Sequence, residues 1–175
     1  MGKVFPGRYT ERSEQDVTVF LIGMRFNKPW RVDRWIPVFV AMPRMLFHLA
    51  THPQDGLLGS HLWFGRTVIL LQYWENPEKL RGFAADSDAP HLGPWRRFMR
   101  TVGKDDAVGI WHETYVAPAG SRESIYVNMP AFGAAKALSH VQVGDGARTA
   151  SQRMAAPTGT NDRDESGPAA SNPEA

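Results

Sequence analysis

Two stretches of this sequence read as β-strands that are apolar on both faces. The first covers residues 16–26 and the second covers residues 66–75. Side chains alternate across a strand, so a strand in a half-exposed sheet shows one apolar face and one polar face. These two strands therefore predict a sheet that is covered on both sides, and this requirement limits the folds open to the chain.

The remaining elements are placed by helical spacing and by turn residues. Asn76 followed by Pro77 is a helix start signal, because asparagine caps a helix and proline is tolerated at its first position. The predicted elements in chain order are strand 16–26, helix 34–50, strands 57–64 and 66–75, helices from Pro77 and from Pro94 to Gly103, strand 109–115, strand 123–127 and a short helix 134–138. The order β-α-β-β-α-β with one additional strand is the ferredoxin-like pattern.

A ferredoxin-like unit has helices on only one face of its sheet. Because the predicted strands are apolar on both faces, the bare face needs a cover, and a second copy of the chain would supply it. The expected fold class is therefore α+β, a ferredoxin-like β-α-β-β-α-β unit with an extra C-terminal strand that pairs sheet to sheet as a homodimer.

The helix expected over residues 34–50 is apolar nearly all round. A surface helix shows one apolar stripe, so this helix should be covered on a second side as well. A partner subunit, a lipophilic ligand or a membrane surface would provide that cover, and the first two are favoured. Asp33 is the expected N-cap, and Pro43 is expected to kink or split the helix.

The length of 175 residues, 42% of them hydrophobic, predicts one domain with a substantial core. Residues 1–15 are expected to form an N-terminal arm, and residues 16–143 the domain. Beyond residue 143 the aromatic residues vanish and small and polar residues dominate. Such a segment buries too little apolar surface to offset its ordering entropy, so residues 144–175 are predicted to be a disordered tail.

Composition excludes several classes of function. The chain has no Cys, which rules out disulfides, thiolate metal sites and cysteine nucleophiles. Its net charge is +2 without a run of Lys or Arg along a helix, so no nucleic-acid partner is expected. The polar start lacks the core of a signal peptide, and the most apolar run, residues 35–50, is shorter than the roughly 20 residues that span a bilayer. We therefore expect a cytoplasmic protein without stable membrane insertion.

The strand expected over residues 109–115 carries His112 and Glu113. Both faces of this strand change from apolar to polar in the same direction, which indicates either the wall of a partly polar cavity or a core strand whose end reaches solvent. Neighbouring strand residues point to opposite faces, so the two side chains cannot form an acid/base pair within one subunit. His112 is a candidate general base or haem ligand, and Glu113 is a candidate partner for Arg66 or Arg122.

The other histidines differ in their surroundings. His91 lies between Pro90 and Pro94, and two prolines restrict that loop, which would hold an imidazole in place; the alternative is an ordinary surface histidine. His61 lies on the strand 57–64 and is a candidate pocket residue. The histidines expected to be structural or exposed are His48, His52 and His140.

Aromatic residues are abundant, with six Trp and nine Phe. Packing is their ordinary role, but together they predict a cavity suited to a flat or lipophilic molecule. The candidate substrate-binding residues are Trp74, Trp95, Trp111, Tyr115 and His61. The sequence lacks a Gly-rich phosphate loop, a Ser/His/Asp spacing and a carboxylate cluster, so neither a dinucleotide cofactor nor a metal site is assigned.

Several runs resemble a family of small monooxygenase-like proteins typified by a fumagillin-pathway polyketide monooxygenase. The runs lie within residues 15–140 and are Met42-Pro43-Arg44-Met45, Gln72-Tyr73-Trp74, residues 91–98 from His91 to Phe98, Gly109-Ile110-Trp111-His112-Glu113-Thr114-Tyr115 and residues 125–130 from Ile125 to Pro130. The family is similar to dimeric α+β barrel proteins, among them antibiotic-biosynthesis monooxygenases and, more distantly, spheroidene monooxygenase and aldoxime dehydratases.

The resemblance implies a dimeric α+β barrel and an oxidoreductase of secondary metabolism that acts on a lipophilic or polyketide-like substrate with O₂. It leaves the cofactor open, because some of these relatives use haem with a His ligand and others use no cofactor. His112, His91 and Glu113 are the catalytic candidates, and His91 or His112 would be the ligand if haem is bound. The alternatives are a haem-dependent lyase of the aldoxime-dehydratase type and a non-catalytic ligand-binding dimer.

Overall fold

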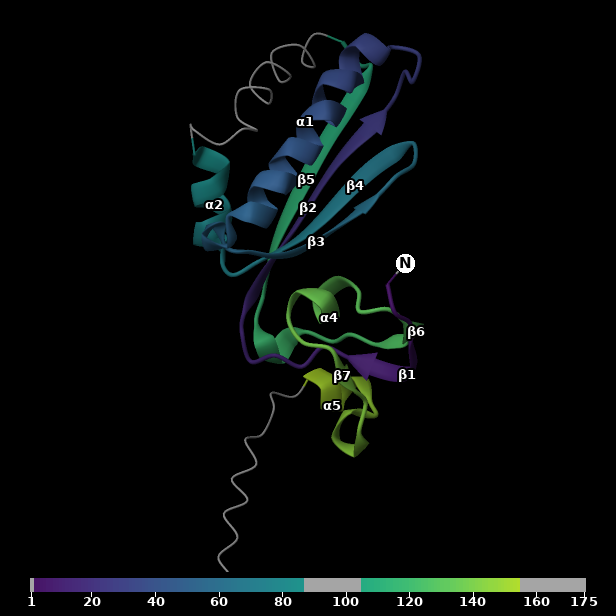
Figure 1. The fold of residues 1–175 in the computed structure, drawn as a ribbon, viewed down its shortest axis with the longest axis vertical. Coiled ribbons are helices and arrows are strands. Elements are labelled where there is room, and N and C mark those ends of the chain that lie inside the picture. The colour runs from purple at the N-terminus through teal and green to yellow at the C-terminus, as the bar shows by residue number, and fades with distance from the viewer. Residues whose placement is uncertain (1, 87–104, 155–175) are drawn as a thin grey trace, which may run out of the picture.

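The computed structural model describes residues 2–86 and 105–154, which form two antiparallel sheets (Figure 1). The elements of the larger part are β2 (Val17–Phe26), α1 (Val32–Thr51), η1 (Pro53–Asp55), β3 (Leu57–Trp63), β4 (Thr67–Trp74), α2 (Pro77–Ala85) and β5 (Val108–Ala117). The elements of the smaller part are β1 (Phe5–Thr10), η2 (Ala119–Ser121), β6 (Tyr126–Met129), α4 (Gly133–Ala137), β7 (Val141–Gln142), η3 (Asp145–Ala147) and α5 (Ala150–Met154).

The larger sheet has the strand order β3-β4-β2-β5, in which all pairs are antiparallel. The first strand of the unit, β2, therefore lies between the third and the fourth, as in a ferredoxin-like fold. Helices α1 and α2 both contribute side chains to the same face of this sheet. The α+β, ferredoxin-like prediction is confirmed. The helix predicted from Pro94 lies outside the described residues.

Local signals account for the helix boundaries. The Asn76 side chain accepts a hydrogen bond of 2.8 Å from the backbone N–H of Lys79, and Pro77 is the first helical residue of α2, as predicted. Helix α1 begins earlier than expected, at Val32, so Asp33 lies in its first turn and Arg31 occupies the N-cap position.

Pro43 is expected to kink or split the helix at residues 34–50, and it does not split it, because α1 continues through Pro43 to Thr51. A proline in a helix interior removes one backbone hydrogen bond and crowds the preceding turn. Packing of the inner flank of α1 offsets that cost: Trp35 and Phe39 pack against one cluster of buried residues, and Leu49 belongs to a second.

The two faces of the larger sheet differ in burial. Along β4, the side chains on the helix-covered face are Val68, Leu70, Gln72 and Trp74, and each is at most 2% exposed. Ile69, Leu71 and Tyr73 alternate with them and are half-buried. The strand is apolar on both faces as the sequence predicts, but within one chain only the helix face is fully covered. We call the other face the open face.

The smaller sheet changes the expected role of residues 1–15. The sequence predicts an extended arm, whereas β1 pairs with β6 on one side and with β7 on the other. Gly7 has a φ of +96° at the irregularity in β1, and its backbone N–H donates to the Asn128 side chain at 2.9 Å. The extra C-terminal strand predicted at residues 123–127 is thus β6, and it joins β1 rather than the ferredoxin-like sheet.

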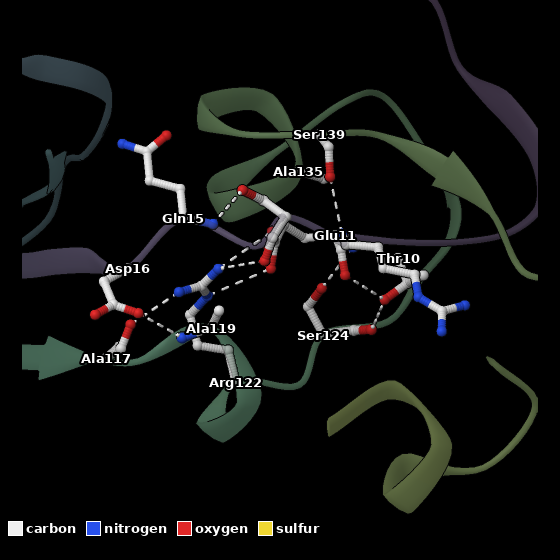
Figure 2. A network of polar contacts seen from close by, with 12 residues as sticks. Thr10, Glu11, Gln15, Asp16, Ala117, Ala119, Arg122, Ser124, Ala135 and Ser139 are labelled. Carbon is white, nitrogen blue, oxygen red and sulfur yellow. Dashed lines mark hydrogen bonds and ion pairs between the residues drawn. The ribbon is translucent and has the colours of Figure 1, made fainter. Parts of the chain in front are cut away.

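A buried ion pair holds the two segments that connect the sheets (Figure 2). Glu11 follows β1 and Arg122 precedes β6, and their side chains are 5% and 10% exposed with 3.4 Å between Oε1 and Nη2. Arg122 also donates to the carbonyl oxygens of Ala117 at 2.8 Å and Ser13 at 3.1 Å. Each of the three guanidinium nitrogens therefore donates to an oxygen, as burial of a charge requires.

Part of the segment that the sequence predicts to be a tail has secondary structure. Residues 144–175 are expected to be disordered, yet residues 145–154 form η3 and α5. Arg153 fixes this segment, since its Nε donates to Glu123 at 2.6 Å and its Nη1 donates to the carbonyl oxygen of Ala147 at 3.0 Å. Residues 155–175 lie outside the described residues, and the domain boundaries at 15/16 and 143/144 stay predictions.

Tyr73 connects the open face of the larger sheet to α4. Its hydroxyl lies beside Gly133, whose φ of +55° opens the turn before the helix, and the hydroxyl of Tyr126 lies there too. Burial, the Tyr126 hydroxyl and the Glu11 carboxylate raise the pKa of Tyr73 to about 12, although the backbone N–H of Ala134 lowers it. Gly59 of β3 and Ala137 of α4 are also in close contact, so the smaller part covers one end of the open face.

Replacing Arg122 by Met should lower the free energy of unfolding by about 3 kcal/mol or more, because the Glu11 carboxylate would stay buried without its cation. Urea unfolding of the purified variant measures this. Arg81→Met is the matched control, since Arg81 and Glu78 form an ion pair with side chains 72% and 69% exposed. That control should cost less than about 1 kcal/mol. Equal losses in both variants would contradict the role given to Arg122.

The raised pKa of Tyr73 makes stability depend on alkaline pH. The unfolded chain loses the phenol proton near pH 10, about the ordinary value, whereas the folded chain keeps it to about pH 12. The unfolded state then binds fewer protons, so the free energy of unfolding should fall across this window. Tyr73→Phe should remove the late phenolate absorbance step and flatten this fall. Tyr9→Phe serves as the control, and loss of the late step in that variant instead would contradict the assignment.

Candidate active site

A cavity of about 410 Å³ lies between the larger sheet and helices α1 and α2. The sheet contributes side chains from β2, β4 and β5, α1 contributes Met42 and Met45, and α2 contributes residues from Leu80 to Ala84. The lining residues are Phe20, Ile22, Gly23, Met24, Met42, Met45, Leu70, Gln72, Trp74, Leu80, Arg81, Phe83, Ala84, Ile110, His112 and Thr114. Most of these are apolar, and the volume is in the range of small-molecule sites.

His112 stands on the wall of this cavity at its exposed rim. It pairs with Ile22 of β2 in the strand register, and its ring centroid lies 5.9 Å from that of Phe20. Ile110 and Thr114, two residues away on either side, line the same cavity. Among the lining residues that the structure describes, His112 is the single imidazole.

Gln72 brings a second polar group into the cavity, on β4. Its side chain is buried, and its Oε1 accepts a hydrogen bond of 3.2 Å from Nε1 of Trp74. This contact fixes the orientation of the Gln72 amide, so that its NH₂ group can donate a hydrogen bond to a ligand. Strand β2 separates Gln72 from His112, so the two polar groups lie on opposite sides of the Phe20 and Ile22 side chains. Trp74 is fully buried and lines the cavity beside Gln72.

Glu113 lies on the open face, away from His112. It pairs with Leu21 of β2, and its Oε2 accepts a hydrogen bond of 2.7 Å from the hydroxyl of Tyr115. That bond raises the pKa of Tyr115. The placement of His112 and Glu113 on opposite faces agrees with the strand alternation. The expectation that Glu113 binds Arg66 or Arg122 is wrong, since Glu113 binds Tyr115 and Arg122 binds Glu11.

Two further candidates, Trp111 and His61, also belong to the open face. The Trp111 indole lies over Gly23, where an added Cβ would stand 2.3 Å from Nε1, so only glycine admits the ring there. His61 packs edge-on against Trp63 and Phe132, with ring centroids 4.2 and 4.3 Å away. Of the predicted site residues, the cavity therefore gathers His112 and Trp74, and the open face gathers Glu113, Tyr115, Trp111 and His61.

The remaining histidines and candidates are placed as follows. His48 stacks on His52 and its Nε2 lies 3.2 Å from Asp55, and His140 stacks on Tyr9. These contacts agree with structural roles. His91 and Trp95 lie outside the described residues, so their roles stay predictions. Within the described ranges no group of three or more His, Asp or Glu side chains is placed to hold a metal ion.

Sequence reasoning missed Gln72 and the two cavity methionines. The signal for Gln72 was present, because it is the single polar residue in the run Val68-Ile69-Leu70-Leu71-Gln72-Tyr73-Trp74. A polar side chain in the middle of a doubly apolar strand must find a partner, which makes it a candidate for ligand binding. Met42 and Met45 carry no such signal, although methionine adapts to ligands of varied shape.

The described residues include a side chain of the type that binds haem iron. A haem site requires an imidazole that faces an apolar cavity, and His112 meets that requirement on the cavity wall. The same residues also fit a reaction without a cofactor, in which an imidazole takes a proton from a lipophilic molecule. The arrangement thus offers one imidazole, one amide donor, the Thr114 hydroxyl and the Arg81 guanidinium in a largely apolar lining.

Comparisons of the sequence with known proteins point to one family. The family model described as Monooxygenase af470-like matches residues 17–134. Monooxygenase af470 of Aspergillus fumigatus is 25% identical over 127 residues, which cover 67% of this chain and 45% of that protein. The chain therefore spans less than half the length of this curated relative.

Solved structures of aldoxime dehydratases share the fold. One, OxdRE in complex with butyraldoxime, is similar with a TM-score of 0.58 and 16% identity over 79% of this chain and 42% of that one. A second aldoxime dehydratase has a TM-score of 0.57 and 15% identity over 79% of this chain and 43% of that one. These likenesses concern the fold, whereas the family model covers the whole larger sheet and all the residues that line the cavity. The chain belongs to the Monooxygenase af470-like family.

Proposed function

We propose that this protein is a monooxygenase that oxidises a lipophilic, polyketide-like molecule in the cavity between the sheet and helices α1 and α2. The observation that carries the proposal is His112, a single imidazole on the wall of an otherwise largely apolar cavity of about 410 Å³. Family membership supports the reaction class, and the apolar lining supports the class of substrate. Polyketide-like molecules carry acidic CH₂ groups between carbonyls, which an imidazole is able to deprotonate.

The proposed reaction needs no group beyond the substrate, O₂ and His112. The imidazole removes one proton from the activated CH₂, and the resulting carbanion forms a C–O bond with O₂. The peroxide then loses its second C–H proton as its O–O bond breaks, which gives a ketone and water. The balance is R₂CH₂ + O₂ → R₂C=O + H₂O, with carbon oxidised and oxygen reduced. A general base at this step contributes about 10²–10⁴ in rate.

Gln72 is proposed to stabilise the anion. Its Oε1 is held by Trp74 Nε1, so its NH₂ group is free to donate to an enolate oxygen that enters the cavity. A donor whose direction is fixed before the reaction stabilises developing charge without reorganisation. Gln72 is 2% exposed and its neighbours in the lining are apolar, so little water competes for this hydrogen bond.

Haem is the alternative cofactor, and His112 would hold it in this cavity. When bound, haem would supply iron for oxygen chemistry or for dehydration of an aldoxime. The residues of this chain would then orient the substrate against the apolar wall. The lyase alternative takes support from the fold of the aldoxime dehydratases alone. A visible spectrum of the purified protein distinguishes a protein with bound haem from one that works without a cofactor, since only bound haem gives a Soret band.

A homodimer through the open face is proposed as the working form. This face carries half-buried apolar side chains of three adjacent strands, among them Leu21, Leu71 and Trp111. A second copy of the same sheet would cover them symmetrically. The Glu113–Tyr115 pair would then lie at the dimer interface, away from the cavity, which argues against a catalytic role for Glu113 within one subunit.

His112→Ala should lower oxygen consumption with 1-phenylbutane-1,3-dione, a lipophilic probe with an acidic CH₂, by about 10²–10⁴. The fold should survive, because the side chain lies at the exposed rim of the cavity. Oxygen uptake and the melting temperature are measured on one preparation.

Glu113→Ala is the matched control for that experiment. It changes an exposed neighbour on the other face of β5 and should keep the rate. An equal loss of rate in both variants, or full activity per folded molecule of His112→Ala, would defeat the assignment of His112 as the base.

Leu71→Arg should dissociate the homodimer by placing a charge in the open face. Sedimentation equilibrium at micromolar concentration measures the mass. Val116→Arg is the control, because Val116 lies on the other face of β5, is 58% exposed, and should tolerate the same change. A wild-type protein that sediments as a stable monomer would rule out pairing through this face.

A further inference from the structure

Thr114 is a polar residue of the cavity lining that has no role in the reaction proposed above. Its side chain lies on the same face of β5 as His112, two residues further along the strand, and it is exposed at the rim of the cavity. Within residues 2–86 and 105–154 its hydroxyl forms no hydrogen bond. A hydroxyl both donates and accepts, so this group is available to a ligand in the cavity.

The register of the sheet places Thr114 in one row with Gln72. Phe20 of β2 pairs with Gln72 of β4 on one side and with Thr114 of β5 on the other, and all three side chains line the cavity. His112 belongs to the neighbouring row, and its ring centroid lies 5.9 Å from that of Phe20. A ligand that lies over the Phe20 ring therefore meets a polar group at each end of the row and an imidazole beside the ring.

The spacing of the strands limits which molecules fit this row. Neighbouring strands lie about 4.8 Å apart, so the backbones of Gln72 and Thr114 are about 10 Å from each other. Two hydrogen bonds of about 2.9 Å each take up part of this separation and leave about 4 Å between two acceptor oxygens. The oxygens of a 1,3-dicarbonyl are about that far apart when its two carbonyls point away from each other. A molecule with one carbonyl reaches only one of the two donors.

We propose that Thr114 is a specificity-determining residue, whose hydroxyl donates to one oxygen of a 1,3-dicarbonyl substrate while the Gln72 amide donates to the other. The proposal deepens the proposed monooxygenase function and rests on it for the identity of the substrate. When His112 takes the CH₂ proton, the negative charge of the carbanion spreads over both oxygens. Two donors stabilise more of that charge than one donor does.

The two donors differ in burial. Gln72 is 2% exposed, whereas Thr114 lies at the exposed rim. Water competes for the hydroxyl more than for the amide, so the hydrogen bond from Gln72 should be the stronger of the two. A ligand with a single carbonyl should therefore bind to Gln72 and make no use of Thr114.

Arg81 is the remaining polar residue of the described lining. It lies on α2, across the cavity from the sheet, and its Nη2 donates to Glu78 at 2.7 Å. Its side chain is 72% exposed, so this cation is hydrated as well as paired. Recognition of an uncharged dicarbonyl is accordingly assigned to the row of Gln72 and Thr114.

Two ligands that lack an acidic CH₂ test this assignment separately from turnover. The first, 2,2-dimethyl-1-phenylbutane-1,3-dione, has both carbonyls, and the second, 2,2-dimethyl-1-phenylbutan-1-one, has one. Calorimetric titration of the full chain measures both affinities, and the wild type should bind the dione more tightly. Thr114→Val should weaken binding of the dione about threefold to tenfold, as loss of one neutral hydrogen bond does, and leave binding of the monoketone unchanged.

Thr114→Ser is the matched control, because it keeps the hydroxyl and removes only a methyl group. It should bind the dione nearly as the wild type does, and both variants should keep the melting temperature, since the side chain is exposed. Equal affinities of the wild type for the two ligands would overturn the assignment. A Thr114→Val variant that binds the dione as the wild type does, or that loses affinity for both ligands alike, would overturn it too.

Oxygen uptake with 1-phenylbutane-1,3-dione distinguishes failure of this assignment from failure of the proposed function. A wild-type chain that shows the expected binding pattern but consumes no oxygen would refute the monooxygenase reaction and leave the two hydrogen bonds in place. A wild-type chain that consumes oxygen but binds both ligands equally would keep the reaction and refute the role of Thr114.

Discussion

The pairing of β2 with a neighbour on each side is the constraint on which the rest of the larger sheet depends. Its register runs from Val17 to Phe26 against β5 and from Thr18 to Arg25 against β4. This double ladder decides which side chains face α1 and which reach the open face. It also sets Gly23 beneath Trp111, where the ring comes too close for any other residue. The register of β2 therefore determines both the lining of the cavity and the composition of the open face.

The Glu11–Arg122 ion pair connects the larger sheet to the smaller sheet. Glu11 lies in the segment between β1 and β2, and Arg122 lies in the segment between β5 and β6, so the pair joins the two chain segments that leave the ferredoxin-like sheet at the same end. Both partners are buried, and each is costly without the other. The first residues and the residues after 117 consequently depend on one another, although more than a hundred positions separate them in sequence.

The sequence predicts the elements whose signals are local and misses those that depend on distant partners. Alternation in residues 66–75 and the Asn76-Pro77 pair were sufficient for β4 and for the start of α2. Strand β1 escaped prediction because Pro6 and Gly7 interrupt its pattern, and only pairing with β6 makes it a strand. Helix α5 escaped for the same reason, since Arg153 is fixed by Glu123, thirty residues away.

The candidate site shows the same division. Strand alternation separated His112 from Glu113 correctly, whereas their partners, Phe20 and Tyr115, depend on the register and on side-chain conformation. That separation also has an evolutionary consequence. Because adjacent strand residues face opposite sides, a shift of β5 by one position would exchange the two side chains. The imidazole of His112 would move to the open face, and the carboxylate of Glu113 would enter the cavity. An insertion or deletion of one residue before Val108 therefore offers a change of chemistry that leaves every residue of the strand intact.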